Sequence, residues 1–203
     1  MLEAISEEQV RSGLQVMVGE IDQVPSSVSA IKVDGKRAYD RARAGEDVNL
    51  AARKVRIYSI SVGEIRREKT GIDVGVDVQC SSGTYIRAIA RDLGEALDVG
   101  GHLTALRRTT MGPFDVQDAC DVDDIAADKL MSLADVACQV MPSVNVTAAQ
   151  SVELGRGKTI FLEAPAGVEK DAPIAAVDPT GRLVAIVSIE SGRSRILVGF
   201  PAE

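Results

Sequence analysis

The sequence is poor in the residues that most often build metal and redox sites. It has no tryptophan, one histidine and three cysteines among 203 residues. Cys80, Cys120 and Cys138 lie far apart and form no C-x-x-C pair, which argues against a disulfide framework and against a structural zinc site. His102 alone cannot supply a histidine cluster, and a single histidine more often packs or caps a helix than catalyses. We therefore expect no metal site.

Long hydrophobic runs are also missing. No apolar stretch approaches the roughly 18–20 residues that span a bilayer. The first ten residues, MLEAISEEQV, are acidic and lack the basic-then-apolar pattern of a signal peptide. Hydrophobic residues make up 45% of the chain and charged residues 26%, which is typical of a globular protein. We expect a cytoplasmic protein with no membrane partner, large enough for one domain and a small second one.

Charge is distributed unevenly along the chain, whose formal net charge is −7. Residues 25–110 contain fifteen basic and eleven acidic side chains, whereas both flanking regions are acidic. A basic stretch within an acidic protein can attract phosphate locally, because salt confines exposed charges to a range of roughly 8–10 Å. The alternative is an ordinary solvated surface.

The first half of the chain shows alternating local patterns. Ser6 is a typical N-cap for a short amphipathic helix, which we expect to end at Gly19. Residues 29–33 form an expected strand, with Asp34-Gly35 as a hairpin turn. A brief helix is expected over residues 39–44.

Two longer strands are expected next. Residues 53–62 are rich in β-branched side chains, and residues 72–80 alternate strictly between apolar and polar side chains. The sequence Glu68-Lys69-Thr70-Gly71 between them is typical of a turn. We predict an antiparallel hairpin with one face in the core and the other in water.

The segment CSSGTYIRAIARDLG, residues 80–94, predicts a strand, a turn and a helix. A single apolar stripe follows helical spacing through Ile86, Ile89, Ala90, Leu93 and Leu97. Residues 82–84 are then the expected turn and helix cap, and Tyr85 and Arg87 fall in the first turn, away from the stripe.

An arginine at this place is unusual. The N-terminus of a helix favours negative charge, so Arg87 is poorly placed for the dipole of its own helix. The position makes sense if an anionic partner approaches, either a carboxylate or a phosphate. The alternative is that the side chain only covers neighbouring apolar surface.

The segment GGHLTALRRTTMGPF, residues 100–114, contains a glycine turn, an expected short element with Leu103 and Leu106, and then paired Arg107-Arg108. Further on, GRGKT at residues 155–159 is similar to a phosphate-binding loop. We reject that interpretation because Val152 stands where the first glycine should be, and because a helix-like stretch precedes it instead of a strand.

Three segments in this order, VPSSVSAIKVDGKRAYDRARAG, CSSGTYIRAIARDLG and GGHLTALRRTTMGPF, resemble the bacterial tRNA pseudouridine synthases of the TruB type. The resemblance is strong over residues 13–120. It continues more weakly to the end, where LGRGKTIFL and RILVGF resemble a small PUA-like module. It implies an α+β fold: residues 1–142 as the C-terminal part of a mixed-sheet catalytic domain, and residues 143–203 as a PUA-like RNA-binding domain.

The resemblance also implies a mechanism. Enzymes of this family isomerise uridine 55 in the T loop of tRNA. An aspartate attacks the flipped-out nucleotide, the glycosidic bond breaks, and the base is rejoined through carbon, without metal or organic cofactor. Tyr85 would lie against the base, Arg87 would pair with the aspartate, and Leu106 would line the pocket. The partner would be the T stem-loop of tRNA, with phosphate contacts from these basic residues: Lys32, Lys36, Arg37, Arg107 and Arg108.

One element of the family pattern is not found in these 203 residues, namely the G-x-L-D-P-x-A-x-G loop with the nucleophilic aspartate. We therefore expect this chain to be the C-terminal portion of a longer enzyme, inactive by itself, whose missing N-terminal segment is its partner. A non-catalytic module that binds tRNA is the alternative. A globular interaction protein without an RNA role is a third possibility, which the three ordered motifs disfavour.

Overall fold

The computed structural model describes residues 4–25, 32–33, 36–37 and 50–200. The chain forms two compact units, residues 1–106 and residues 107–203, and each is described by itself. Helices and sheets occur in both units, so the expected α+β class is confirmed. None of the described helices is long and apolar enough to cross a membrane.

The first helix, α1, spans Glu7–Gln15 and begins as predicted. The Ser6 hydroxyl accepts a hydrogen bond from the Gln9 N–H at 3.1 Å, and the Gln9 side chain accepts one from the Ser6 N–H at 2.8 Å. This reciprocal capping box satisfies two amides at the helix start. The expected end at Gly19 is wrong, because Gly19 is already the first residue of β1 (Gly19–Gln23). Ile21 is the only large aliphatic side chain in β1, so the apolar alternation is too weak to reveal the strand.

A three-stranded antiparallel sheet forms the centre of the first unit, in the order β1–β4–β5. Strand β4 spans Arg53–Arg67 and continues past the expected end at residue 62, because Ile65 still pairs with Val74 of β5. Strand β5, Ile72–Cys80, is confirmed, and the turn between them closes with a 2.9 Å hydrogen bond from the Glu68 N–H to the Gly71 carbonyl. Within the described part of the sheet, β5 is an edge strand.

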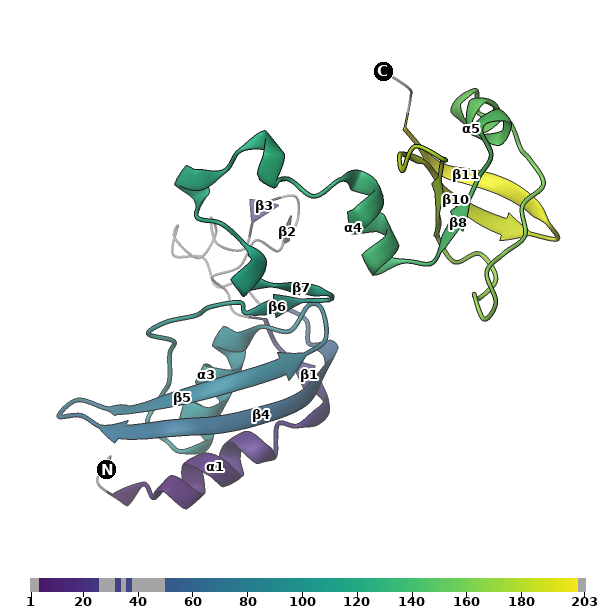
Figure 1. The fold of residues 1–203 in the computed structure, drawn as a ribbon. Helices are drawn as coiled ribbons and strands as arrows, with labels where there is room; N and C mark the ends of the chain where they lie inside the picture. The colour runs from purple at the N-terminus through teal and green to yellow at the C-terminus, as the bar shows by residue number, and fades with distance from the viewer. Residues whose placement is uncertain (1–3, 26–31, 34–35, 38–49, 201–203) are drawn as a thin grey trace. The chain divides into compact units, whose positions relative to one another are not determined.

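Helices α1 and α3 (Ile86–Ala96) cover one face of this sheet (Figure 1). Val10 and Leu14 of α1, Ile57 of β4 and Ile89 of α3 are buried together. The alternating apolar residues of β5 pack against the same cluster and remain half-buried, whereas the polar residues between them are exposed. The predicted one-sided hairpin is therefore confirmed.

A small antiparallel hairpin lies between β1 and β4 in sequence. It consists of β2 (Lys32–Val33) and β3 (Lys36–Arg37), with Lys32 opposite Arg37 and Val33 opposite Lys36. The paired strands agree with the predicted hairpin. The expected turn at residues 34–35 and the expected helix at residues 39–44 lie outside the described residues.

The second unit opens with short elements. Strands β6 (Thr110–Met111) and β7 (Phe114–Asp115) pair antiparallel. Three single-turn 3-10 helices and helix α4 follow, and their bounds are Val116–Asp118, Val122–Asp124, Ala127–Lys129 and, for α4, Leu133–Val140.

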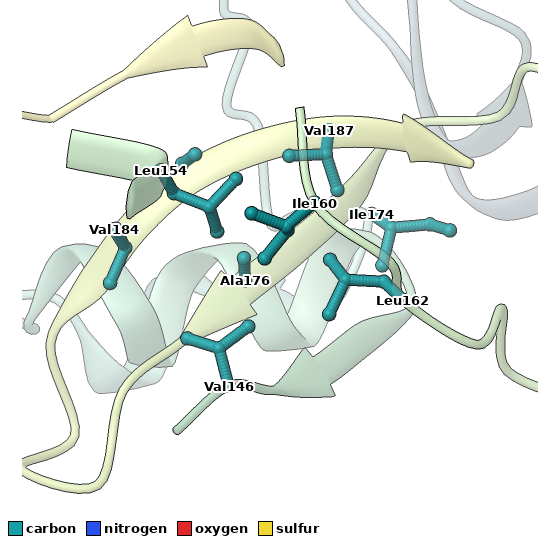
Figure 2. Packing of buried hydrophobic residues seen from close by; sticks show 9 residues of the cluster. Val146, Leu154, Ile160, Leu162, Ile174, Ala176, Val184 and Val187 are labelled. Carbon is teal, nitrogen blue, oxygen red and sulfur yellow. The ribbon is translucent and has the colours of Figure 1, made fainter. Parts of the chain in front are cut away.

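The main sheet of this unit has the order β11–β10–β9–β8. Its strands are β8 (Ser143–Asn145), β9 (Ile174–Val177), β10 (Leu183–Glu190) and β11 (Arg193–Gly199), and helix α5 (Ala148–Gly155) follows β8. Strands β8 and β9 are parallel, and the other neighbours are antiparallel. Figure 2 shows aliphatic side chains from α5, the sheet and the segment after α5 converging on one core. Ala134 and Ala137 of α4 pack in a second cluster with Ala175 and Leu183.

The segment GRGKT starts at the last residue of α5, and the Arg156 N–H still bonds to carbonyls of that helix. A phosphate-binding loop precedes its helix, whereas this segment follows one. The structure therefore agrees with the rejection of a phosphate loop.

The turn from β9 to β10 is organised by one carboxylate. Asp178 accepts hydrogen bonds from the Thr180 hydroxyl at 2.6 Å, the Thr180 N–H at 2.9 Å and the Arg182 N–H at 3.2 Å. It also pairs with the Arg182 guanidinium at 3.3 Å. These donors, the Thr180 hydroxyl first, lower the pKa of Asp178 to about 2.

We predict that Asp178→Asn destabilises the second unit at neutral pH and flattens its acid response. The depressed pKa means that the carboxylate stabilises the fold fully above its unfolded pKa of about 4, and that this contribution disappears as pH falls toward 2. Thermal unfolding between pH 7 and pH 2 measures the effect. Exposed Asp128→Asn is the matched control. Equal pH slopes for wild type and Asp178→Asn would contradict the assignment.

Candidate active site

The connection from β5 to α3 is a tightly hydrogen-bonded turn. Beyond the end of β5, the Ser81 N–H donates to the Arg56 carbonyl at 2.8 Å, and the Ser81 hydroxyl accepts from the Arg56 N–H at 3.0 Å. The Ser81 carbonyl accepts from the Thr84 hydroxyl at 2.9 Å. Gly83 has a φ of 85°, which a residue with a Cβ rarely adopts. The turn therefore fixes where helix α3 begins relative to the sheet.

The N-cap of α3 is Tyr85, and its own side chain forms no cap hydrogen bond. The expected cap within residues 82–84 is therefore wrong, although the turn is there. The capping function passes to Gln23 at the end of β1. The Tyr85 N–H donates to the Gln23 side-chain oxygen at 2.7 Å, and the Gln23 amide nitrogen donates to the Tyr85 carbonyl at 3.2 Å. Gln23 is only 2% exposed.

Sequence reasoning missed Gln23. The available signal is its position on an alternating strand, two residues after Ile21 and therefore on the same face. A buried glutamine must find partners for its amide, because an unpaired polar group in a protein interior costs free energy. Gln23 finds both in the backbone of one residue, and this fixes the place of Tyr85.

A second contact joins the same two elements. The Arg91 guanidinium of α3 donates to the Val24 carbonyl at 2.9 Å and pairs with Asp92 at 2.6 Å. Gln23 and Val24 together hold the end of β1 against the first two turns of α3. Val24 therefore lies beside α3.

Arg87 is the second residue of α3, and its side chain is exposed. Among the described residues it has no hydrogen-bond or ion-pair partner, and the first turn of α3 contains no acidic side chain. Free N–H groups at a helix start and an unpaired guanidinium both favour a negative charge. The geometry suits an incoming carboxylate or phosphate.

After α3 the chain turns back along the helix. The N–H groups of Val99 and Gly100 both donate to the Gly94 carbonyl at 3.0 Å. A Cβ on Gly101 would lie 2.1 Å from the Ala90 carbonyl oxygen, so only glycine permits this approach. Because Gly100 lies beside Gly94 and Gly101 beside Ala90, the chain runs toward the start of α3.

The expected short element around Leu103 and Leu106 is wrong. Residues 101–109 form neither a helix nor a strand; two leucines three residues apart are too weak a pattern to specify a helix. Leu106 is 58% exposed and lies outside the hydrophobic cluster of its unit.

The proposed phosphate-contacting residues are divided between the two units. The β2–β3 hairpin contains Lys32, Lys36 and Arg37. Arg107 and Arg108 open the second unit; both are exposed, and Arg108 donates to the Met111 sulfur at 3.6 Å. The structure thus brings Gln23 to Tyr85, and Arg87 follows two residues later in the same helix start.

No group of three or more potential metal-binding side chains is found in the described portion of the chain. Cys80 is half-buried, and the other two cysteines are exposed and unpaired.

Comparison with solved structures defines the class of fold. The structure described as a Cbf5-Nop10-Gar1 complex matches with a TM-score of 0.68 and 22% identity, over 98% of this chain and 62% of the matched chain. An H/ACA RNP bound to a substrate RNA containing 2′-deoxyuridine matches with a TM-score of 0.70 and 20% identity, over the same shares. The chain therefore has the fold found in these assemblies.

Sequence comparison gives the family. The N-terminal domain of the TruB family pseudouridylate synthases matches residues 1–86, and the C-terminal domain of tRNA pseudouridylate synthase B matches residues 87–140. The tRNA pseudouridine synthase B of Arthrobacter sp. (strain FB24) is 45% identical over 97% of this chain and 67% of its own length. That of Mycobacterium ulcerans is 46% identical over 97% and 64%. This chain belongs to the TruB family of pseudouridylate synthases. It spans about two thirds of the length of these relatives.

We predict that Gln23→Leu loosens the start of α3. The substitution keeps the apolar bulk but leaves the Tyr85 N–H without its partner, which costs about 1–3 kcal/mol of unfolding free energy. Hydrogen exchange at the Tyr85 amide should accelerate more than exchange in β4. Gln79→Leu, an exposed glutamine on β5, is the control and should change neither quantity. Unchanged exchange at Tyr85 would show that Gln23 does not hold the cap.

Proposed function

We propose that this chain serves in the isomerisation of uridine 55 to pseudouridine in the T loop of tRNA, as part of a longer enzyme. The observation that supports this most directly is the placement of Tyr85 and Arg87. Tyr85 is fixed by its backbone at the junction of strand and helix, and Arg87, two residues later, is exposed and has no partner among the described residues. Both lie within the regions matched to the family.

The reaction breaks the bond from the sugar to N1 of uracil and forms a bond from the sugar to C5; C5 releases its proton, and N1 gains one. It is an isomerisation, so it requires no oxidant or reductant. Arg87 orients the attacking carboxylate by charge and hydrogen bonding. Tyr85 lies against the flipped base and takes part in proton transfer, and Leu106 lines the pocket. The exposed side chain of Leu106 is available for such a contact.

We assign residues 1–142 to the catalytic domain and residues 143–203 to a PUA-like RNA-binding domain. The second assignment is supported by the compact mixed sheet of β8–β11 with α5. In this proposal the T stem-loop of tRNA is the partner, the cytoplasm is the location, and the basic residues contact phosphates.

A second function is favoured by one observation about the sequence. The 203 residues contain no G-x-L-D-P-x-A-x-G loop, and the catalytic aspartate of the family belongs to that loop. By itself, the chain would then be a module that binds tRNA without changing it.

We predict that the 203-residue chain alone releases no tritium from tRNA labelled at C5 of uridine. Adding the N-terminal segment of a relative, with its aspartate loop, should restore release. The same segment with its aspartate replaced by asparagine is the control. Release by the chain alone at an ordinary enzyme rate would overturn the assignment of the nucleophile.

We predict that Arg87 and the basic residues affect different quantities. Alanine at any one of these basic positions should weaken the binding of cognate and scrambled T loops equally: Lys32, Lys36, Arg37, Arg107 or Arg108. It should also lower the salt dependence of the affinity by about one unit of slope per lost phosphate contact. Arg87→Ala in the reconstituted enzyme should preserve affinity and lower catalysis by a factor on the order of 100. Loss of binding in Arg87→Ala, together with unchanged salt slopes elsewhere, would place the RNA on another surface.

A further inference from the structure

The second unit displays an aromatic ring on its surface. Phe161 is 69% exposed, although its neighbours Ile160 and Leu162 are buried in the core. Side chains alternate along an extended segment, so two buried neighbours force the residue between them outward. Phe161 is therefore held out in the solvent by the packing of the residues on either side.

The backbone around this ring is firmly held. The Leu162 N–H donates to the Gly192 carbonyl at 3.0 Å, and the Ser194 N–H donates to the Ile160 carbonyl at 2.9 Å. The buried Ser194 hydroxyl accepts from the Ile160 N–H at 3.0 Å. Phe161 thus lies opposite Arg193 at the start of β11. The exposure of the Phe161 ring is therefore fixed by backbone hydrogen bonds of the fold.

An arginine stacks on the ring. The guanidinium carbon of Arg193 lies 4.8 Å from the centre of the Phe161 ring. A planar cation over an aromatic face is a favourable pair, and both groups are exposed here. We call this pair the Phe161–Arg193 stack.

Two arginines lie beside the ring, in a unit that is acidic as a whole, and exposed Glu163 follows two residues after Phe161. Arg195 is exposed and lies two residues beyond Arg193, with buried Ser194 between them, so the two arginines share one face of β11. Glu190, opposite Arg193 in the sheet, is paired with Lys170 at 2.7 Å. Glu190 also interacts electrostatically with Arg195, but among the described residues neither Arg193 nor Arg195 forms an ion pair. Both guanidinium groups can therefore bind an anionic partner.

We propose that the Phe161–Arg193 stack binds an unpaired base of single-stranded RNA, with Arg195 contacting the adjacent phosphate. Aromatic rings and guanidinium planes are the groups on which proteins stack unpaired bases, and neighbouring arginines bind the backbone. An acidic peptide would use the arginines but not the ring, and a purely apolar partner would use the ring but not the arginines. The proposal rests on the proposed function for the choice of RNA, and it gives the second unit a specific contact.

The test is the affinity of the 203-residue chain for a fluorescent oligoadenylate of about eight nucleotides, measured by anisotropy over a range of salt concentrations. Phe161→Ala should weaken binding about 5- to 100-fold and leave the salt slope unchanged, because stacking is lost and no charge is removed. Arg195→Ala should lower the salt slope by about 0.7. A duplex RNA of the same length offers no unpaired base, so Phe161→Ala should not change its binding.

Two further variants separate stacking from simple apolar contact. Phe161→Trp should retain the affinity for the oligoadenylate. Phe161→Leu should lose as much affinity as Phe161→Ala, because leucine is apolar but has no aromatic face. Leu130→Ala is the matched control, because Leu130 is 68% exposed in the same unit and should be neutral. Because Phe161 is exposed, all variants should keep the wild-type unfolding temperature.

Absence of oligoadenylate binding by the wild type, full affinity in Phe161→Ala, or full affinity in Phe161→Leu would each overturn the proposal. Its failure is distinguishable from that of the proposed function. If the reconstituted enzyme modifies tRNA while Phe161→Ala binds the oligoadenylate normally, only the stack is wrong. If the reconstituted enzyme is inactive, but the wild-type chain binds the oligoadenylate and Phe161→Ala does not, the stack stands and the proposed function fails.

Discussion

The two hydrogen bonds between the Gln23 side chain and the Tyr85 backbone determine the geometry of the candidate site. They join the last residue of β1 to the first turn of α3, across 62 positions of sequence. A buried amide tolerates few alternative positions, because any displacement leaves a polar group unpaired. The turn held by Ser81 and the contact from Arg91 to Val24 act at the same junction. Tyr85 and Arg87 owe their position relative to the sheet to this junction.

The two units differ in how one charged side chain of each is paired. In the turn from β9 to β10, Asp178 is fully hydrogen-bonded, its pKa is depressed, and it faces its own arginine. At the start of α3, Arg87 has no partner among the described residues, although the helix terminus beside it also favours an anion. The first arrangement stabilises a fold, whereas the second leaves binding free energy available to a ligand.

The proposals assign the two units different forms of RNA recognition. In the first unit, Lys32, Lys36 and Arg37 lie in the region of net positive charge and would supply affinity without sequence preference. The second unit is acidic, so its contact would depend on one exposed ring with two arginines beside it. Phosphate contacts weaken steeply with salt, whereas stacking does not, and this difference separates the two contributions in experiment.

The sequence alone determined the elements that depend on near neighbours. The capping box of Ser6 and Gln9, the alternation of β5 and the apolar stripe of α3 follow from spacings of two to four residues, and three ordered segments identified the family. Only the tertiary structure decided the rest. Gln23 caps a distant helix, Gly101 fits against Ala90, and Phe161 meets Arg193 because separate segments pack together. The spacing of Leu103 and Leu106 suggested a short element that does not form. Local spacing cannot reveal the close packing of Gly101 against Ala90, which comes just before it.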